Sequence, residues 1–158
     1  MQLSQLLLRL CDAEIDFVVV GGFAAVLHGS TMVTRDIDVC MVMSADNISK
    51  LRAILRDAHP THRFTTQRLS FLDNPDPGVE LKNLYLQTDL GALDVLGSIM
   101  GIGSFEDVRR DAVQVQLLGK SVRVIGVKDL IRAKEALGRE KDLITAKELR
   151  AIMEKRGL

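Results

Sequence analysis

Residues 17–29 read FVVVGGFAAVLHG, and residues 34–39 read TRDIDV. The bulky, β-branched run 17–20 is typical of a buried strand. Gly21 and Gly22 then allow a sharp turn and a close approach to a ligand, and the alanine-containing run 23–27 favours a short helix. Free N–H groups and the dipole at the start of such a helix attract phosphate. The stretch predicts a strand, a glycine turn suited to phosphate, a helix and a second strand.

Asp36 and Asp38 lie on that second strand. Residues two apart on a strand share a face and are about 6.5 Å apart along it. Two carboxylates at this spacing can close on one Mg²⁺ ion or on a pair of them. An exposed strand face or a hairpin end is the alternative. Because apolar residues follow the acids on both faces of the strand, we expect the two carboxylates at the strand's end, over a cleft.

Asp94 is the third acidic residue of interest. It lies within the apolar run 92–96, which pairs in our prediction with 84–87 across a turn at 88–91. A carboxylate in such a strand is costly to bury without a partner. It can cap a loop or pair with an arginine, or it can join the other two aspartates on a cation. We predict the last, with Asp94 also accepting the proton of an attacking hydroxyl.

These motifs, in this order, resemble the nucleotidyltransferase superfamily, whose fold is shared by polymerase β and the small antibiotic nucleotidyltransferases. Within it the chain most resembles the single-domain group that includes the AbiEii-type toxins. The chain departs from the group at Met32, where an arginine is frequent. The resemblance spans about residues 18–142. The matching positions are Gly21, Gly22, Ala24, His28, Gly29, Thr34, Asp36, Ile37, Asp38, Leu130, Ile131, Lys134, Arg139, Lys141 and Asp142.

The resemblance implies a fold, an activity and a set of site residues. The fold is α/β (α+β): a mixed sheet flanked by helices, in one nucleotidyltransferase domain over 1–158 with a helical tail at 127–158. The activity is transfer of a nucleoside monophosphate from an NTP such as ATP to an acceptor hydroxyl, with Mg²⁺ or Mn²⁺ as cofactor. The catalytic and metal-binding residues are Asp36, Asp38 and Asp94. The nucleotide-binding residues are Gly21, Gly22, Lys134, Arg139 and Lys141.

The tail carries an excess of positive charge. From Gly126 onward there are nine Lys and Arg against six Asp and Glu, while the remainder has twelve against fifteen. We expect two helices separated at Gly138. Lys134 shares a face with leucines, so it either extends to solvent or reaches a triphosphate. Arg139 and Lys141 oppose the dipole at the start of the second helix, and Asp142 can pair with either.

Other elements follow from periodicity and turn residues. Leucines at helical spacing predict a helix over 3–10, with Ser4 as its N-cap. Ser44 predicts the start of a helix over 45–58. Alternating patterns at 112–117 and 121–125 predict a hairpin.

The segment 59–78 contains all three prolines and reads as a loop. Within it, Phe64 and the run 69–72 are expected to belong to short strands.

Composition sets the class of protein. With 47% hydrophobic and 27% charged residues the chain is typical of a globular protein. Zero net charge gives no argument for nucleic-acid binding, and 4% aromatics without tryptophan disfavour an extended base-stacking surface. Cys11 and Cys40 are expected as free thiols. We expect a cytoplasmic location, because no signal peptide is visible and the longest apolar run, 17–27, is too short to span a membrane.

The acceptor and the partners stay open at this stage. A tRNA, a protein hydroxyl and a small molecule all remain candidate acceptors, and an antitoxin protein is a candidate partner. An inactive binding module of the same fold is the alternative function, supported only by Met32. A sugar transferase using Asp-x-Asp ranks last, because the stretch before Asp36 is short for a nucleotide-binding half.

Overall fold

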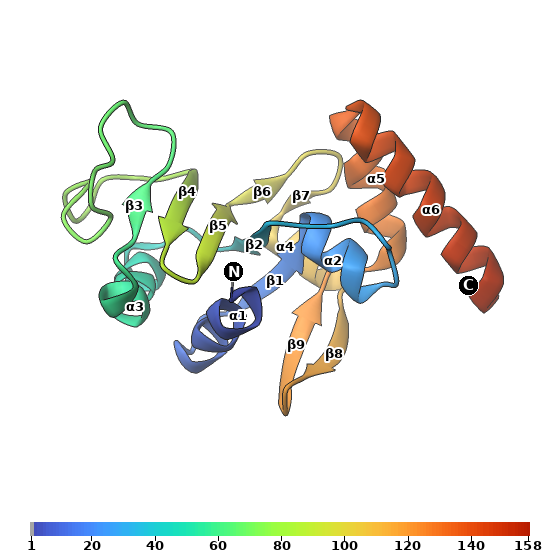
Figure 1. Ribbon diagram of the computed structural model, residues 1–158, viewed down its shortest axis with the longest axis horizontal. Helices are drawn as coiled ribbons and strands as arrows, with labels where there is room; N and C mark the ends of the chain where they lie inside the picture. The colour runs from blue at the N-terminus through green and yellow to red at the C-terminus, as the bar shows by residue number, and fades with distance from the viewer. Residues whose placement is uncertain (1) are drawn as a thin grey trace.

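The apolar run at 17–20 forms β1 (Phe17–Val20), and all four of its residues are buried. The computed structural model describes residues 2–158, and its main sheet has seven strands in the order β3-β4-β5-β2-β1-β9-β8. Parallel and antiparallel pairs both occur, and helices flank the sheet (Figure 1). The predicted mixed α/β class is confirmed.

The remaining elements have the following bounds: α1 (Leu3–Asp12), α2 (Gly21–Leu27), β2 (Asp36–Met41), α3 (Ala45–Leu55), η1 (Arg56–Ala58), β3 (Thr61–His62), β4 (Asn83–Thr88), β5 (Gly91–Leu96), β6 (Ser98–Ile99), β7 (Gly103–Ser104), α4 (Phe105–Arg110), β8 (Val113–Leu117), β9 (Lys120–Val124), α5 (Val127–Leu137) and α6 (Glu140–Arg156).

Strand β2 lies near the middle of the sheet and sets the register around it. It pairs antiparallel with β1, where Val20 is opposite Asp38, and parallel with β5, where Asp94 is opposite Asp38. Helix α2 starts directly after Val20, so its first residue comes next to the same aspartate. The pairing therefore brings the start of α2 and two aspartates of different strands to one place.

The core is built from the apolar faces of the helices against the sheet. In α1, Leu6, Leu7 and Leu10 are buried, as the helical spacing predicts, and α1 packs against α3. At the other end of the chain, α5 and α6 pack as an antiparallel pair, and α5 contacts α2 (Figure 1). The predicted tail helices are confirmed, and Gly138, with φ +70°, ends the first of them.

Three local predictions were wrong. Ser4 does not cap α1, because the helix begins one residue before it, at Leu3, with Gln2 as the N-cap. Leu3 packs against the core as part of the helix. Phe64 lies outside any strand, and of the segment 69–72 only Ser70 forms an isolated bridge, to Thr61. The prolines of this region and the many bends between them leave β3 only two residues long.

Two helix boundaries also differ from expectation. No separate glycine turn precedes α2, because Gly21 and Gly22 are its first residues. The predicted helix 45–58 ends at Leu55 and continues as the 3-10 turn η1, although Ser44 caps its start as expected by accepting a hydrogen bond from the Asn47 N–H.

Sequence reasoning missed helix α4. Its signal was the capping box of Ser104 and Asp107, in which each side chain accepts a hydrogen bond from the backbone N–H of the other residue. The hairpin of β8 and β9 was correctly predicted. Across residues 2–158, none of the helices combines the length and the apolar character that a membrane crossing requires.

Candidate active site

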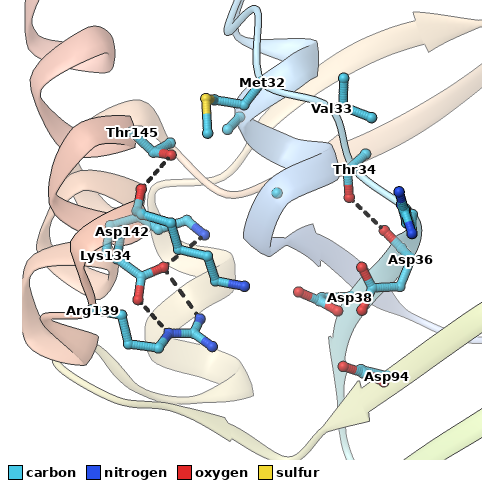
Figure 2. Close-up of a pocket in the computed structure, with 14 residues that line it drawn as sticks. Met32, Val33, Thr34, Asp36, Asp38, Asp94, Lys134, Arg139, Asp142 and Thr145 are labelled. Atoms are coloured by element: carbon cyan, nitrogen blue, oxygen red, sulfur yellow. Dashed lines mark hydrogen bonds and ion pairs between the residues drawn. The ribbon is translucent and has the colours of Figure 1, made fainter.

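Three carboxylates meet where β2 and β5 run side by side. Asp36, Asp38 and Asp94 each place one oxygen within 4.8 Å of the others. Asp36 and Asp38 are two apart on β2, and Asp94 is opposite Asp38 on the neighbouring parallel strand. All three side chains point into the same space in Figure 2. The expectation that Asp94 lies on the same side of the sheet as the other two therefore holds in the structure.

Asp38 is the carboxylate of this cluster whose charge is least well compensated by its surroundings. Its Oδ1 atom is buried and has no hydrogen-bond partner among residues 2–158. Burial and, after it, the neighbouring charges of Asp94 and Asp36 together raise the pKa of Asp38 to about 7. Buried polar atoms are nearly always paired in proteins. Together with the two neighbouring carboxylates, this buried oxygen forms a set of oxygen ligands of the kind that a divalent cation binds.

Asp94 carries a second partner that sequence reasoning did not identify. Arg63 donates from Nη2 to Asp94 Oδ1 at 2.6 Å and from Nη1 to the Leu86 carbonyl at 3.1 Å. Burial raises the pKa of Asp94, and the Arg63 hydrogen bond and charge oppose that rise. Asp94 thus pairs with an arginine, which was one of the alternatives, and it also lies close to the other two aspartates. Arg63 gave no signal because it lies in an irregular segment.

Gly21 has no room for a side chain. Its φ is +66°, a left-handed conformation, and a methyl group there would overlap Asp38 Oδ2. At Gly22, an added methyl group would be 3.1 Å from Thr34 Oγ1. Gly21 thus lets the start of α2 approach Asp38 closely, and Gly22 lets it approach Thr34.

A pocket of about 380 Å³ connects the carboxylates with the C-terminal helices. All the site residues predicted from the sequence line it except Gly21, which lies in an adjoining pocket with Asp38, Lys134 and Arg139. Figure 2 shows the aspartates of the sheet on one side and Lys134 and Arg139 on the facing side. The aspartates of strand β2 therefore face cationic residues that lie more than ninety residues further along the chain.

The facing side is organised by Asp142, whose side chain is 1% exposed. Arg139 Nε donates to it at 2.6 Å and Lys134 Nζ at 3.4 Å. Burial alone raises the pKa of Asp142, but the Arg139 and Lys134 interactions outweigh it and hold the pKa below the usual value. Asp142 thus pairs with Arg139 and Lys134 together. Two cations and one anion leave this wall of the pocket positive.

The loop between α2 and β2 closes the upper side of the pocket, and α6 holds it in place. Glu148 accepts hydrogen bonds from the Ser30 hydroxyl and from both the N–H and the hydroxyl of Thr31. At the end of the loop, the Thr34 hydroxyl donates to the Asp36 carbonyl at 3.0 Å. Glu148 was not predicted, because nothing in its local sequence distinguishes it from an ordinary helix-surface glutamate.

No protein-family model and no curated protein matches this chain. Solved structures do. LnuA, a lincosamide antibiotic adenylyltransferase solved with lincomycin bound, has a TM-score of 0.62 at 17% identity, with 94% of each chain covered. An antigenic nucleotidyltransferase-like protein from Paracoccidioides brasiliensis has a TM-score of 0.59 at 14% identity, covering 96% of this chain and 73% of that one. TM1012 from Thermotoga maritima, provisionally described as a nucleotidyltransferase, has a TM-score of 0.58 at 16% identity, covering 96% and 92%.

Likeness at this level of identity shows the fold. The chain has the nucleotidyltransferase fold, as the motif order predicts. The narrower resemblance to the AbiEii-type toxins is not confirmed by these comparisons.

Proposed function

We propose that this protein is a divalent-metal-dependent nucleotidyltransferase, which transfers a nucleoside monophosphate from an NTP to an acceptor hydroxyl. The observation that carries the proposal is the cluster of Asp36, Asp38 and Asp94, together with the buried Asp38 Oδ1, which has no hydrogen-bond partner in the described part of the chain. The nucleotidyltransferase fold supports it, and so does the positive wall across the pocket.

Asp36, Asp38 and Asp94 are the residues that would hold Mg²⁺ or Mn²⁺. Their hard carboxylate oxygens suit either ion, and a cation would relieve the repulsion that raises the pKa of Asp38. When bound, the ion supplies Lewis-acid stabilisation of the charge that develops on the phosphate oxygens. The three aspartates contribute the fixed geometry that this role needs.

The nucleotide would lie between the glycine start of α2 and the C-terminal helices. The backbone N–H groups of Gly21 and Gly22 would approach the phosphates from one side. The charge of the polyphosphate would be neutralised from the other side by three residues that line the pocket: Lys134, Arg139 and Lys141. Asp142 holds the first two in place without cancelling both charges.

The proposed reaction is an in-line displacement. The acceptor oxygen forms a bond to the α-phosphorus, the bond from that phosphorus to the bridging oxygen breaks, and pyrophosphate leaves with the electron pair. Asp94 takes the proton of the acceptor hydroxyl. In the metal-free protein burial raises the pKa of Asp94, and Arg63 holds the carboxylate in orientation for the proton transfer.

A label-transfer assay tests the proposal. The protein is incubated with Mg²⁺, α-³²P-labelled NTPs and fractionated cell extract as the source of acceptor, and label in product is counted. We expect transfer by the natural protein, and a loss of at least about a hundredfold in Asp36→Asn, since one charged ligand of the reacting centre is removed. Asp16→Asn, at an exposed aspartate, is the matched control. If titration calorimetry finds no NTP binding in the presence of Mg²⁺, the proposal is contradicted.

Lys134→Met is expected to weaken the binding of Mg²⁺-ATP about ten- to hundredfold, because it removes one charge-assisted contact to phosphate. Titration calorimetry measures the dissociation constant. Lys128→Met, at an exposed lysine of the same helix, is the control and should bind as the natural protein does. Equal affinity of the two variants would remove Lys134 from the nucleotide site. A melting curve of each variant separates lost binding from lost folding.

The finer parts of the proposal concern acceptor and partner. We propose ATP as a donor, a cytoplasmic location, and an acceptor that is a tRNA, a protein or a small molecule. A small molecule is the acceptor class to which the lincomycin-bound LnuA points. A toxin role with an antitoxin partner rests on sequence resemblance alone, and co-purification of a second small protein from the native host tests it. An inactive binding module should bind NTP without transferring label.

A further inference from the structure

Two aromatic rings, the exposed Phe64 and the half-buried Tyr85, lie beside Asp94 on the side away from the C-terminal helices (Figure 1). Tyr85 on β4 is directly opposite Asp94 on β5, so the two side chains leave the same face of the sheet. The Phe64 ring packs against the Tyr85 ring with 5.2 Å between centroids. The Arg63 guanidinium lies 4.9 Å from the centroid of Phe64 while it also binds Asp94.

Phe64 is unusual among the phenylalanines of this protein. It is 73% exposed, whereas Phe17, Phe71 and Phe105 are buried and Phe23 is half-buried. A ring that stays exposed removes little apolar area from water, so it contributes little to the stability of the fold. The ring contacts Tyr85 and Arg63 and still leaves most of its area open to solvent, which is available for stacking.

The direction of the proposed reaction places the acceptor on this side. Across the sheet, Asp38, Asp94 and Tyr85 follow one another on β2, β5 and β4. Lys134 and Arg139 share a pocket with Asp38, and they come from α5 and from the start of α6. Because their positive charges would stabilise the leaving pyrophosphate, it would leave on the side of these helices. In an in-line displacement the attacking oxygen enters opposite the leaving group. The acceptor therefore approaches from the β4 side, where Phe64 and Tyr85 lie.

We propose, on the basis of the function proposed above, that Phe64 and Tyr85 form a stacking platform for the acceptor, whose hydroxyl is presented to Asp94 from a planar ring system such as a nucleoside. Arg63 is the positioning residue that joins the platform to Asp94. Two adjoining rings accommodate one base, which is consistent with a chain too poor in aromatics for an extended stacking surface. Stacking on aromatic rings and on guanidinium planes is how unpaired nucleotides are held.

The composition of the chain offers a direct test. Tyr85 is the one tyrosine in the sequence, so in protein labelled with ε-¹³C tyrosine the aromatic NMR signal of the label comes from the platform alone. The donor site is first filled with Mg²⁺ and α,β-methylene ATP. Adenosine, an RNA trinucleotide with a free 3′ hydroxyl, and ribose are then titrated separately. We expect a saturable shift of the Tyr85 signal with adenosine or the trinucleotide, and none with ribose.

Substitutions at Phe64 provide the matched comparison. Phe64→Leu keeps an apolar side chain without a ring and should weaken binding of the ring probe about five- to hundredfold. Phe64→Trp keeps a ring and should bind as well as the natural protein. Leu118→Ala, at an exposed leucine near the opposite end of the sheet, should change nothing. No saturable shift with either ring probe, an equal shift with ribose, or unchanged affinity in Phe64→Leu overturns the platform.

The same variants keep this inference separate from the proposed function. If label transfer occurs and Phe64→Leu transfers as fast as the natural protein, the platform is wrong and the nucleotidyltransferase stands. If Tyr85 reports ring binding but no label is transferred under any condition, the acceptor role falls with the enzyme. If both hold, the ring probe with the lower dissociation constant shows whether the nucleoside is free or terminates an RNA strand.

Discussion

Asp38→Asn will unfold at a higher temperature than the natural protein at pH 8 in metal-free buffer, and it will transfer no nucleotide. The natural carboxylate is buried beside two like charges, and one of its oxygens finds no hydrogen-bond partner among residues 2–158. Asparagine keeps the shape, removes the charge and adds an N–H donor for the neighbouring carboxylates. Function and stability therefore oppose each other at this position, as they do at sites built to receive a ligand.

The pH dependence fixes the sign of this effect. The pKa of an aspartate in an unfolded chain is about 3.9, whereas in the folded protein burial and like charge raise that of Asp38 to about 7. Between these values the folded state binds more protons than the unfolded state, so the free energy of unfolding falls as pH rises. Above about pH 7 the loss is complete and is on the order of a few kcal/mol. The advantage of Asp38→Asn should be present at pH 8 and absent near pH 4.

Thermal melts at several pH values, with and without Mg²⁺, measure both halves of this prediction. We expect Asp38→Asn to melt roughly 5–10 °C above the natural protein at pH 8 without metal. Added Mg²⁺ should stabilise the natural protein, because it binds only the folded state, and should have little effect on the variant. Equal melting temperatures at pH 8 would show that the buried charge of Asp38 costs the fold no stability. A variant that responds to Mg²⁺ as the natural protein does would show that Asp38 does not bind the metal.

Gly21→Ala will destabilise the protein by more than about 2 kcal/mol and abolish transfer. Two effects combine at this position. The left-handed backbone, with φ +66°, is unfavourable for any residue with a Cβ atom. The new methyl group also overlaps Asp38 Oδ2, so either the start of α2 or the aspartate must move.

Gly119→Ala separates these two effects. Gly119 has a similar left-handed φ of +80°, but no atom of the described residues lies within 4 Å of a methyl group added there. This control should therefore show the backbone cost alone, about 1–2 kcal/mol, with transfer unchanged. Urea unfolding of both variants measures the difference. A Gly21→Ala variant that loses no more stability than Gly119→Ala would show that Asp38 is not crowded by α2.

Local patterns predicted most of the elements of this fold. The apolar run before Gly21 had to be buried, Ser44 capped α3, and the alternating segments before and after Gly119 formed a hairpin. These successes share a cause, since each depends on side chains close together in sequence. Where the chain is irregular the same reasoning failed, and Phe64, expected in a strand, is instead an exposed loop residue.

The sequence by itself determined that Asp36 and Asp38 share one face of a strand, because residues two apart on a strand point to the same side. Only the tertiary structure decided that Asp94 stands opposite Asp38, that Arg63 binds Asp94 and that Asp142 gathers Lys134 and Arg139. Strand register and helix docking join residues that are distant along the chain. They are set by the packing of the whole core, which no short segment contains.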